Sequence, residues 1–259
     1  MSRNPAAATV EASKGPARSG RPLALCVVAF TLIAGSTMAP LCGASSEFSN
    51  PVGRLFTRVE QPLHQYRAYR RMHASSDNAK YEAWLEAWTE LKDGQFSYQI
   101  VNERGSESVR GRVLRAMLAR EQDVVNKGEG DKGDLTAANY EFVEGGRDSD
   151  GAQVVHIKPK RNDVMLVDGR AVLDDRGDLL RVEGRLSKNP SFWTSLVNIV
   201  RRYARIGGVR VPVATETIAK VKFVGTAQLE VLYDYQSVND HPVSLTELRS
   251  TALSHSAAR

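Results

Sequence analysis

The stretch that decides the fold is Val164-Met-Leu-Val-Asp-Gly-Arg-Ala-Val-Leu-Asp-Asp-Arg-Gly-Asp-Leu-Leu-Arg-Val-Glu-Gly-Arg-Leu186. It consists of short apolar runs separated by turn signals. Asp168-Gly169 is typical of a tight hairpin turn, and the polar run 174–178 marks a second turn. Residues 179–186 then alternate apolar and polar side chains. Short strands at this spacing predict an antiparallel meander.

The same pattern continues on both sides of this stretch. Upstream, strands are predicted over 140–143 and 152–158, and downstream the apolar runs fall at 192–203, 209–218, 220–224 and 227–235. Proline has no N–H group to donate to a sheet, so Pro212 predicts that its strand is an edge strand or is bulged. The second half of the chain is therefore predicted to be almost entirely β.

The first half of the chain is less uniform. Residues 81–91 fit a helix with tyrosine, tryptophan and leucine on one face, and they fit a strand equally well, so periodicity leaves both open. Residues 96–100 predict a strand. Residues 110–125 predict an amphipathic helix whose apolar stripe is formed by Val113, Leu114, Met117 and Leu118.

The N-terminal segment predicts a targeting signal and not an element of the fold. Residues 1–21 are polar and basic, and residues 22–44 carry no charge, which is typical of a secretory signal with a cleavage site after Ala44. The alternative is a retained inner-membrane anchor, because the uncharged stretch reaches the ~20 residues that a span needs. We therefore expect a periplasmic protein with a signal peptide over 1–44, a linker over 45–57, one domain over 58–240 and a tail over 241–259.

Composition and cysteine content exclude several classes of protein. The chain has 259 residues, of which 42% are hydrophobic and 25% are charged, so it is neither disordered nor a polytopic membrane protein. Much of the formal charge of +5 lies in the leader, and a nearly neutral body predicts no nucleic-acid partner. Both cysteines, Cys26 and Cys42, also lie in the leader, so the mature chain has no disulfide and no cysteine-ligated metal.

No motif predicts catalysis or a cofactor. Gly128, Gly130 and Gly133 spell a dinucleotide fingerprint, but they follow a predicted helix instead of a strand. The five histidines show no helical metal-binding spacing, and no nucleophile elbow is present. We therefore predict no catalytic residues, no metal and no cofactor. An envelope hydrolase remains the alternative if carboxylates converge in a pocket.

Two parts of the sequence resemble a known family. The first is Tyr66-Arg-Ala-Tyr-Arg-Arg-Met72 with Trp84-Leu-Glu-Ala-Trp-Thr-Glu90, and the second joins Lys158-Pro-Lys-Arg-Asn-Asp163, Val167-Asp-Gly-Arg-Ala-Val172, Arg181-Val-Glu-Gly184 and Ser187-Lys-Asn-Pro-Ser-Phe-Trp-Thr194. Over roughly residues 58–240 the chain resembles secreted bacterial proteins of the outer-membrane lipoprotein-sorting family, which are similar to the LolA-like periplasmic carriers. The resemblance implies an unclosed antiparallel β half-barrel around an apolar cavity, with 82–91 as a strand and 110–125 as a lid helix.

The expected function follows from that resemblance. We expect a non-catalytic carrier that holds a lipid, an acyl chain or a lipoprotein, with an envelope membrane or membrane protein as a further partner. A cluster of arginines is expected to meet anionic headgroups: Arg67, Arg70 and Arg71. The alternative is an envelope structural or protein-interaction module without a cavity. The candidate cavity residues are apolar or aromatic: Trp84, Trp88, Phe96, Tyr98, Met117, Phe192, Trp193 and Tyr203.

Overall fold

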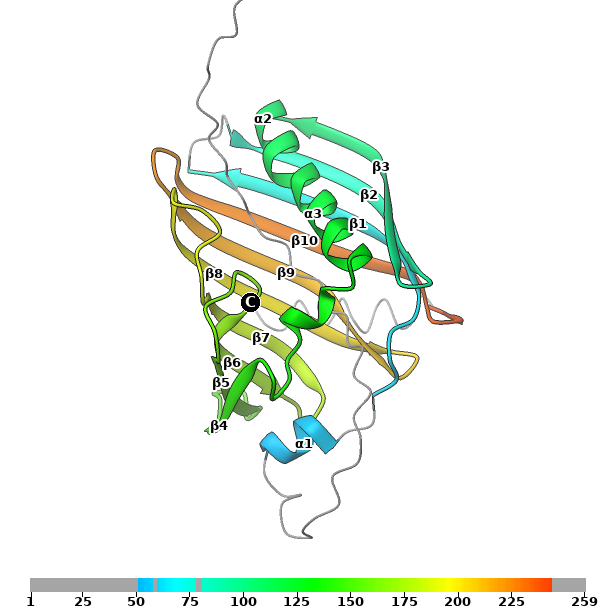
Figure 1. The fold of residues 1–259 in the computed structure, drawn as a ribbon, viewed down its shortest axis with the longest axis vertical. Helices are drawn as coiled ribbons and strands as arrows, with labels where there is room; N and C mark the ends of the chain where they lie inside the picture. Colours follow the sequence, from blue (N-terminus) through cyan, green and yellow to red (C-terminus); the bar gives the residue numbers. More distant parts are fainter. Residues whose placement is uncertain (1–50, 58–59, 78–80, 244–259) are drawn as a thin grey trace, which may run out of the picture.

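The computed structural model describes residues 51–57, 60–77 and 81–243, and these form one open antiparallel sheet with a long helix on its concave face (Figure 1). The strands lie in the order β3-β2-β1-β10-β9-β8-β7-β6-β5-β4, and β11 pairs with β10. The edge strands β3 and β4 do not pair with each other, so the barrel is not closed. The predicted half-barrel is therefore confirmed. The strands are β1 (Tyr66–Ser76), β2 (Ala83–Lys92), β3 (Gln95–Gly105), β4 (Tyr140–Arg147), β5 (Gln153–Pro159), β6 (Val167–Leu173), β7 (Leu179–Leu186), β8 (Thr194–Ile206), β9 (Val209–Val221), β10 (Gly225–Val238) and β11 (His241–Pro242).

The ambiguous segment 81–91 is a strand, and the helix predicted over 110–125 is present. In β2, buried and partly exposed residues alternate with a period of two. The helix runs through α2 (Glu107–Val109), a π-helical segment η2 (Arg110–Arg115) and α3 (Ala116–Asn126). Together these residues, 107–126, are called the lid. Figure 1 shows the lid lying across the concave face of β1, β2 and β3.

The hairpin turn predicted at Asp168-Gly169 is wrong. Both residues lie inside β6, and Gly169 pairs with Gly184 of β7. The two backbones approach so closely that a Cβ atom on Gly169 would lie 2.1 Å from the carbonyl oxygen of Glu183. Glycine is therefore required here for close packing of two strands, a role that the local sequence does not distinguish from a turn. Strand β6 accordingly starts at Val167 and not at Val164.

The bulge predicted from Pro212 is confirmed. The register between β8 and β9 shifts between Arg202 and Tyr203, where Pro212 pairs with Tyr203. On the other side of strand β9, the pairing with β10 ends at Ala214, before it reaches Pro212. The missing N–H of the proline therefore interrupts no β9–β10 hydrogen bond.

Ordered elements also lie on both sides of the predicted domain, 58–240. Residues 51–57, assigned to a linker, form helix α1 (Pro51–Thr57), in which Leu55 is buried and Phe56 packs edge-to-face on Phe142 of β4 at 4.7 Å. At the other end, β11 extends the sheet into the segment assigned to the tail. The predicted leader, 1–44, and residues 244–259 lie outside the described residues.

The concave face carries two separate hydrophobic cores. The first lies between the lid and strands β1, β2, β3, β9 and β10, with Ile206 at the end of β8. The second lies over β4 to β9 and also includes Leu55 of α1. Figure 1 shows the connection 127–139, with the 3-10 turn η3 (Gly130–Gly133), crossing from the lid toward β4 in front of the second half of the sheet.

Candidate functional site

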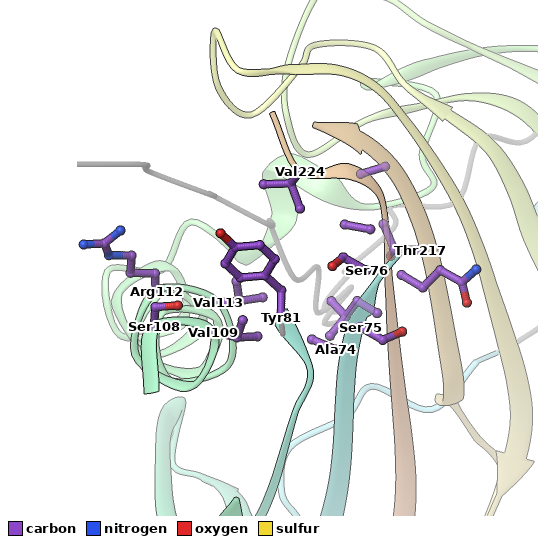
Figure 2. Close-up of a pocket in the computed structure, with 14 residues that line it drawn as sticks. Ala74, Ser75, Ser76, Tyr81, Ser108, Val109, Arg112, Val113, Thr217 and Val224 are labelled. Carbon is purple, nitrogen blue, oxygen red and sulfur yellow. The ribbon is translucent and has the colours of Figure 1, made fainter. Parts of the chain in front are cut away.

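An apolar cavity opens where the lid begins. Its walls come from the N-terminal end of the lid, the end of β1, Tyr81 just before β2, the end of β9 and the beginning of β10 (Figure 2). Its volume is about 90 Å³. Most of the lining side chains are apolar: Ala74, Tyr81, Val109, Val113, Ala219, Val224, Ala227 and Leu229. This space is called the rim cavity.

Polar residues also line the rim cavity: Ser75, Ser76, Ser108, Arg112, Thr217 and Gln228. Figure 2 shows the Arg112 guanidinium pointing away from the cavity, whereas the Tyr81 ring lies between the lid and the sheet. A mostly apolar lining with a few polar groups suits a ligand with an apolar chain and a polar head.

Ion pairs hold the first turns of the lid on the edge strand β3. Glu103 of β3 pairs with Arg110 at 3.2 Å and also with Arg115. Glu107 of the lid pairs with the same two arginines. Arg110 and Glu103 are 21% exposed and Glu107 is 68% exposed, so solvent and salt weaken these pairs. The N-terminal end of the lid is therefore attached by salt-sensitive ion pairs and by the buried side chains of Val109, Val113 and Leu114.

A buried ion pair fixes the middle of the lid to β1. The Arg70 guanidinium donates to both carboxylate oxygens of Glu121, at 2.5 and 2.7 Å, and to the Tyr66 hydroxyl at 2.7 Å. Burial lowers the pKa of Arg70, but the adjacent Glu121 carboxylate outweighs this effect and the pKa lies well above its ordinary value. The guanidinium also lies 5.2 Å from the Phe96 ring and 4.7 Å from the Tyr233 ring.

Side-chain amides hold the C-terminal end of the lid on β3. The Phe96 N–H donates to Asn126 Oδ1 at 2.7 Å, and the Phe96 carbonyl accepts from Asn126 and Gln122 at 3.3 and 3.2 Å. These bonds satisfy backbone groups of an edge strand that would otherwise face solvent. The polar contacts of the lid are thus buried around Glu121 and partly exposed at its beginning, beside the rim cavity.

The second half of the concave face is filled by the connection 127–139. Gly133 and Leu135 of this connection lie against Val182, Ile199 and Tyr203, where the remaining space is only about 20 Å³. Asp134 is 5% exposed, and its Oδ1 atom has no hydrogen-bond partner among the described residues. Burial, with a smaller effect from Asp131, raises the Asp134 pKa to about 7, although Arg210 opposes the shift.

The Asp134 carboxyl makes the stability depend on pH. Its folded-state pKa of about 7 exceeds the ordinary 3.8, so the folded protein holds the proton more tightly than the unfolded chain. The resulting stabilisation is complete below about pH 4 and is lost as the pH rises to about 7. We expect a loss of about 2–4 kcal/mol over this range in urea unfolding. Asp134→Asn removes the dependence, and the exposed control Asp93→Asn leaves it unchanged; equal slopes in all three proteins would contradict this assignment.

Neither Trp84 nor Trp88 faces the cavity. Both lie on the convex face of the sheet and are partly exposed. Trp84 stacks on His73 at 4.8 Å, and Trp88 packs edge-to-face on Tyr69 at 5.1 Å. Cross-strand aromatic pairs of this kind stabilise a sheet without a ligand.

The remaining aromatic and methionine candidates are divided among three places. Phe96 and Met117 are buried between lid and sheet, and Tyr98 packs at the margin of the same core. Tyr203 lies in the second half, beside Leu135. Phe192 and Trp193 lie in the loop between β7 and β8. None of the eight lines the rim cavity, so their role in ligand binding stays a prediction.

The three arginines do not form one surface cluster. Arg70 is 2% exposed and points inward to Glu121. Arg67 and Arg71 are exposed on the convex face, where Arg67 lies over the Trp88 ring and Arg71 pairs with Asp234 at 3.1 Å. The strand alternation explains the split, because residues 67 and 71 share a face that residue 70 does not.

Most lining residues of the rim cavity were missed by the sequence analysis. Val113 belongs to the apolar stripe of the predicted helix, and Val109 lies one turn before it. Residues at i and i+4 share one face of a helix, so this pair could have extended the predicted apolar stripe to Val109. Tyr81 and Val224 lie at strand ends, and the sequence carries no signal that brings them together.

No protein-family model matches the chain, and no curated protein matches it. A LolA superfamily protein from Nitrosomonas europaea has a similar fold. It is 10% identical, the match covers 72% of this chain and 90% of that protein, and the TM-score is 0.32. A DUF1329 family protein from Desulfovibrio piger is 11% identical over 81% of this chain and 96% of that protein, with a TM-score of 0.28. These likenesses concern the fold.

The described residues hold neither a metal cluster nor a membrane-spanning helix. Within residues 51–57, 60–77 and 81–243, no group of three or more histidine, aspartate and glutamate side chains is placed to hold a metal ion. In the same ranges, no helix has the length and apolar character needed to cross a membrane. The rim cavity is therefore the candidate site that the geometry of the described residues supports best.

Proposed function

We propose that this protein is a secreted, non-catalytic carrier that binds the acyl chain of a lipid or of an acylated protein in the rim cavity. The observation that supports this most is an apolar cavity between an open half-barrel and a lid whose adjacent end is attached to β3 by partly exposed ion pairs. Each methylene buried in such a cavity contributes about 0.8 kcal/mol. A carrier needs no further chemistry, because it only has to hide the chain from water.

The present volume of the rim cavity sets a condition on this function. About 90 Å³ is less than the ~150 Å³ of an engineered cavity that binds benzene, and far below the ~300–1,000 Å³ of typical ligand pockets. The cavity therefore accepts only the end of a chain unless the lid moves. The ion pairs of Glu103 and Glu107 are the contacts that such a movement breaks first, since they are more exposed than the Arg70–Glu121 pair.

One observation favours the alternative of an interaction module. Phe192 and Phe223 are strongly exposed at the same end of the sheet, and large exposed apolar groups often mark a protein or membrane contact. An interaction module needs no cavity. Its binding to apolar chains would be weak and independent of their length.

A displacement series distinguishes the two candidates. A dansylated fatty acid is titrated into protein purified from a periplasmic fraction without detergent, and is then displaced by octanoate, decanoate and dodecanoate. The lid has to move to admit chains of this length, and we expect each methylene that it then encloses to strengthen binding by up to about fourfold. Dansyl amide without a chain serves as the control. Equal affinities for octanoate and dodecanoate would overturn the carrier and favour the interaction module.

A further inference from the structure

Three aromatic rings from two loops form a cluster at the end of the sheet where β8 and β10 begin. Phe192 and Trp193 come from the β7–β8 loop, and Phe223 comes from the β9–β10 turn. The Trp193 ring lies 5.5 Å from Phe192 and 5.8 Å from Phe223. A backbone hydrogen bond of 2.9 Å from Lys222 N–H to the Trp193 carbonyl joins the two loops. These three residues are called the aromatic tip.

The aromatic tip is exposed to a degree unusual for such side chains. Phe192 is 79% exposed and Phe223 is 87% exposed, whereas most large apolar side chains of the described residues are buried. The rings contact one another and leave their outer faces in water. The cluster therefore does not serve as a hydrophobic core of this chain.

The backbone at Phe223 is a second and independent observation. Phe223 has a φ of 68°, in the left-handed region that bulky residues rarely occupy. Glycine or asparagine at this position would relieve the strain. A strained backbone that presents an exposed phenyl ring points to a function for that ring, because the fold itself gains nothing from it.

The charges around the aromatic tip suggest what it meets. Lys222 Nζ lies 4.2 Å from the centre of the Phe192 ring, and Lys188 and Lys220 are exposed nearby in the same two segments. The loop 187–193 and the turn 222–224 contain no acidic residue, and the Asp77 carboxylate beside this turn accepts from the Thr226 N–H at 2.8 Å. The turns at the opposite end of the strands are rich in aspartate: Asp93, Asp148, Asp150, Asp174, Asp175, Asp178 and Asp240. Asp148, Asp175 and Asp178 pair there with arginines.

We propose that the aromatic tip docks this protein on an anionic lipid bilayer. Aromatic rings flanked by lysines match the interface of such a membrane, where rings enter the headgroup region and lysines contact phosphate. The aspartates in the turns at the far end disfavour contact of that end with the same anionic surface. Val224 follows Phe223 directly and lines the rim cavity, so docking brings the mouth of the cavity to the membrane. The docking does not depend on the proposed carrier function, since it uses different side chains.

The single tryptophan of the tip provides a direct readout. The chain has three tryptophans, so Trp84→Phe/Trp88→Phe leaves Trp193 as the reporter. We expect its emission to shift to the blue with vesicles of phosphatidylethanolamine and phosphatidylglycerol, and to be quenched by brominated acyl chains. Sedimentation of the unsubstituted periplasmic protein with the same vesicles gives an independent measurement. No shift and no co-sedimentation would overturn the proposal.

Matched variants separate insertion of the rings from unspecific adhesion. Phe192→Ser/Phe223→Asn is expected to weaken vesicle binding at least tenfold, while Val143→Ser, which removes a 61% exposed valine of β4, leaves it unchanged. Lys222→Gln is expected to weaken binding about fivefold, and Lys92→Gln at the far end is expected to have no effect. Equal binding of all variants, or equal binding to phosphatidylcholine and to anionic vesicles, would contradict docking by the aromatic tip on an anionic bilayer.

The strain at Phe223 allows loss of vesicle binding to be distinguished from loss of folding. Phe223→Asn is expected to keep the melting temperature or raise it by about 2–4 °C, because asparagine tolerates the left-handed conformation. The same variant loses vesicle binding. A lower melting temperature would show that the ring stabilises the fold, and would remove the argument from strain.

Discussion

Replacing Glu121 by glutamine is expected to lower the free energy of unfolding by about 3–5 kcal/mol. The substitution keeps the shape of the side chain but leaves the Arg70 guanidinium, 2% exposed and enclosed by Phe96 and Tyr233, without its counter-charge. A buried charge without a partner is among the most destabilising changes in a protein core. Urea unfolding followed by far-ultraviolet circular dichroism measures the difference.

A double variant and a surface pair complete this experiment. Arg70→Met/Glu121→Met removes both charges together, and we expect it to recover most of the loss, since apolar residues of similar length often replace a buried pair without penalty. The exposed pair Arg71–Asp234 is the matched control, and Asp234→Asn should change stability by less than about 1 kcal/mol. If Glu121→Gln and Asp234→Asn have equally small effects, the lid is not held by the Arg70–Glu121 pair.

The second large effect is expected at the rim cavity. Ala227 lines the cavity from β10 and is only partly buried, so Ala227→Trp places an indole ring in the space without forcing it into a closed core. Displacing about three methylenes of a bound chain, at about 0.8 kcal/mol each, weakens binding roughly fiftyfold. Titration with the dansylated fatty acid measures this loss.

The control for this substitution lies on the lid itself. Ala119 is exposed on α3, so Ala119→Trp adds the same ring to the outer face of the lid. We expect it to bind the probe as the unsubstituted protein does, and both variants to keep a cooperative thermal transition. Unchanged binding by a folded Ala227→Trp protein would place the probe elsewhere than in the rim cavity.

The sequence predicted the elements whose pattern is local. The meander from Tyr140 onward and the lid helix were both found from the spacing of apolar residues and turn residues. The strand β2 could not be distinguished from a helix, because Trp84 and Trp88 are apolar on the outer face as well. Their rings are partly exposed and pack on Tyr69 and His73 of the adjacent strand β1. The residues of β2 alone do not reveal this packing.

The features that the sequence did not predict depend on partners far away in the chain. Asp168-Gly169 has the residues of a turn, but the facing Gly184 makes it a site of close strand contact. Arg70 was grouped with its charged neighbours, although the alternation of β1 already placed it with Ala68 and Met72 on the inward face. The rim cavity joins residues as distant as Ala74 and Leu229, and only the completed fold shows it.

Mass spectrometry of organic extracts tests the central claim most directly. The protein is purified from a periplasmic fraction without detergent, beside its Ala227→Trp variant and an unrelated secreted protein treated in the same way. The carrier account predicts a stoichiometric phospholipid or acylated species in the unsubstituted protein, and its loss from the Ala227→Trp variant. Extracts that match the unrelated protein, even after incubation with added lipids, would contradict the claim that this half-barrel carries an acyl chain.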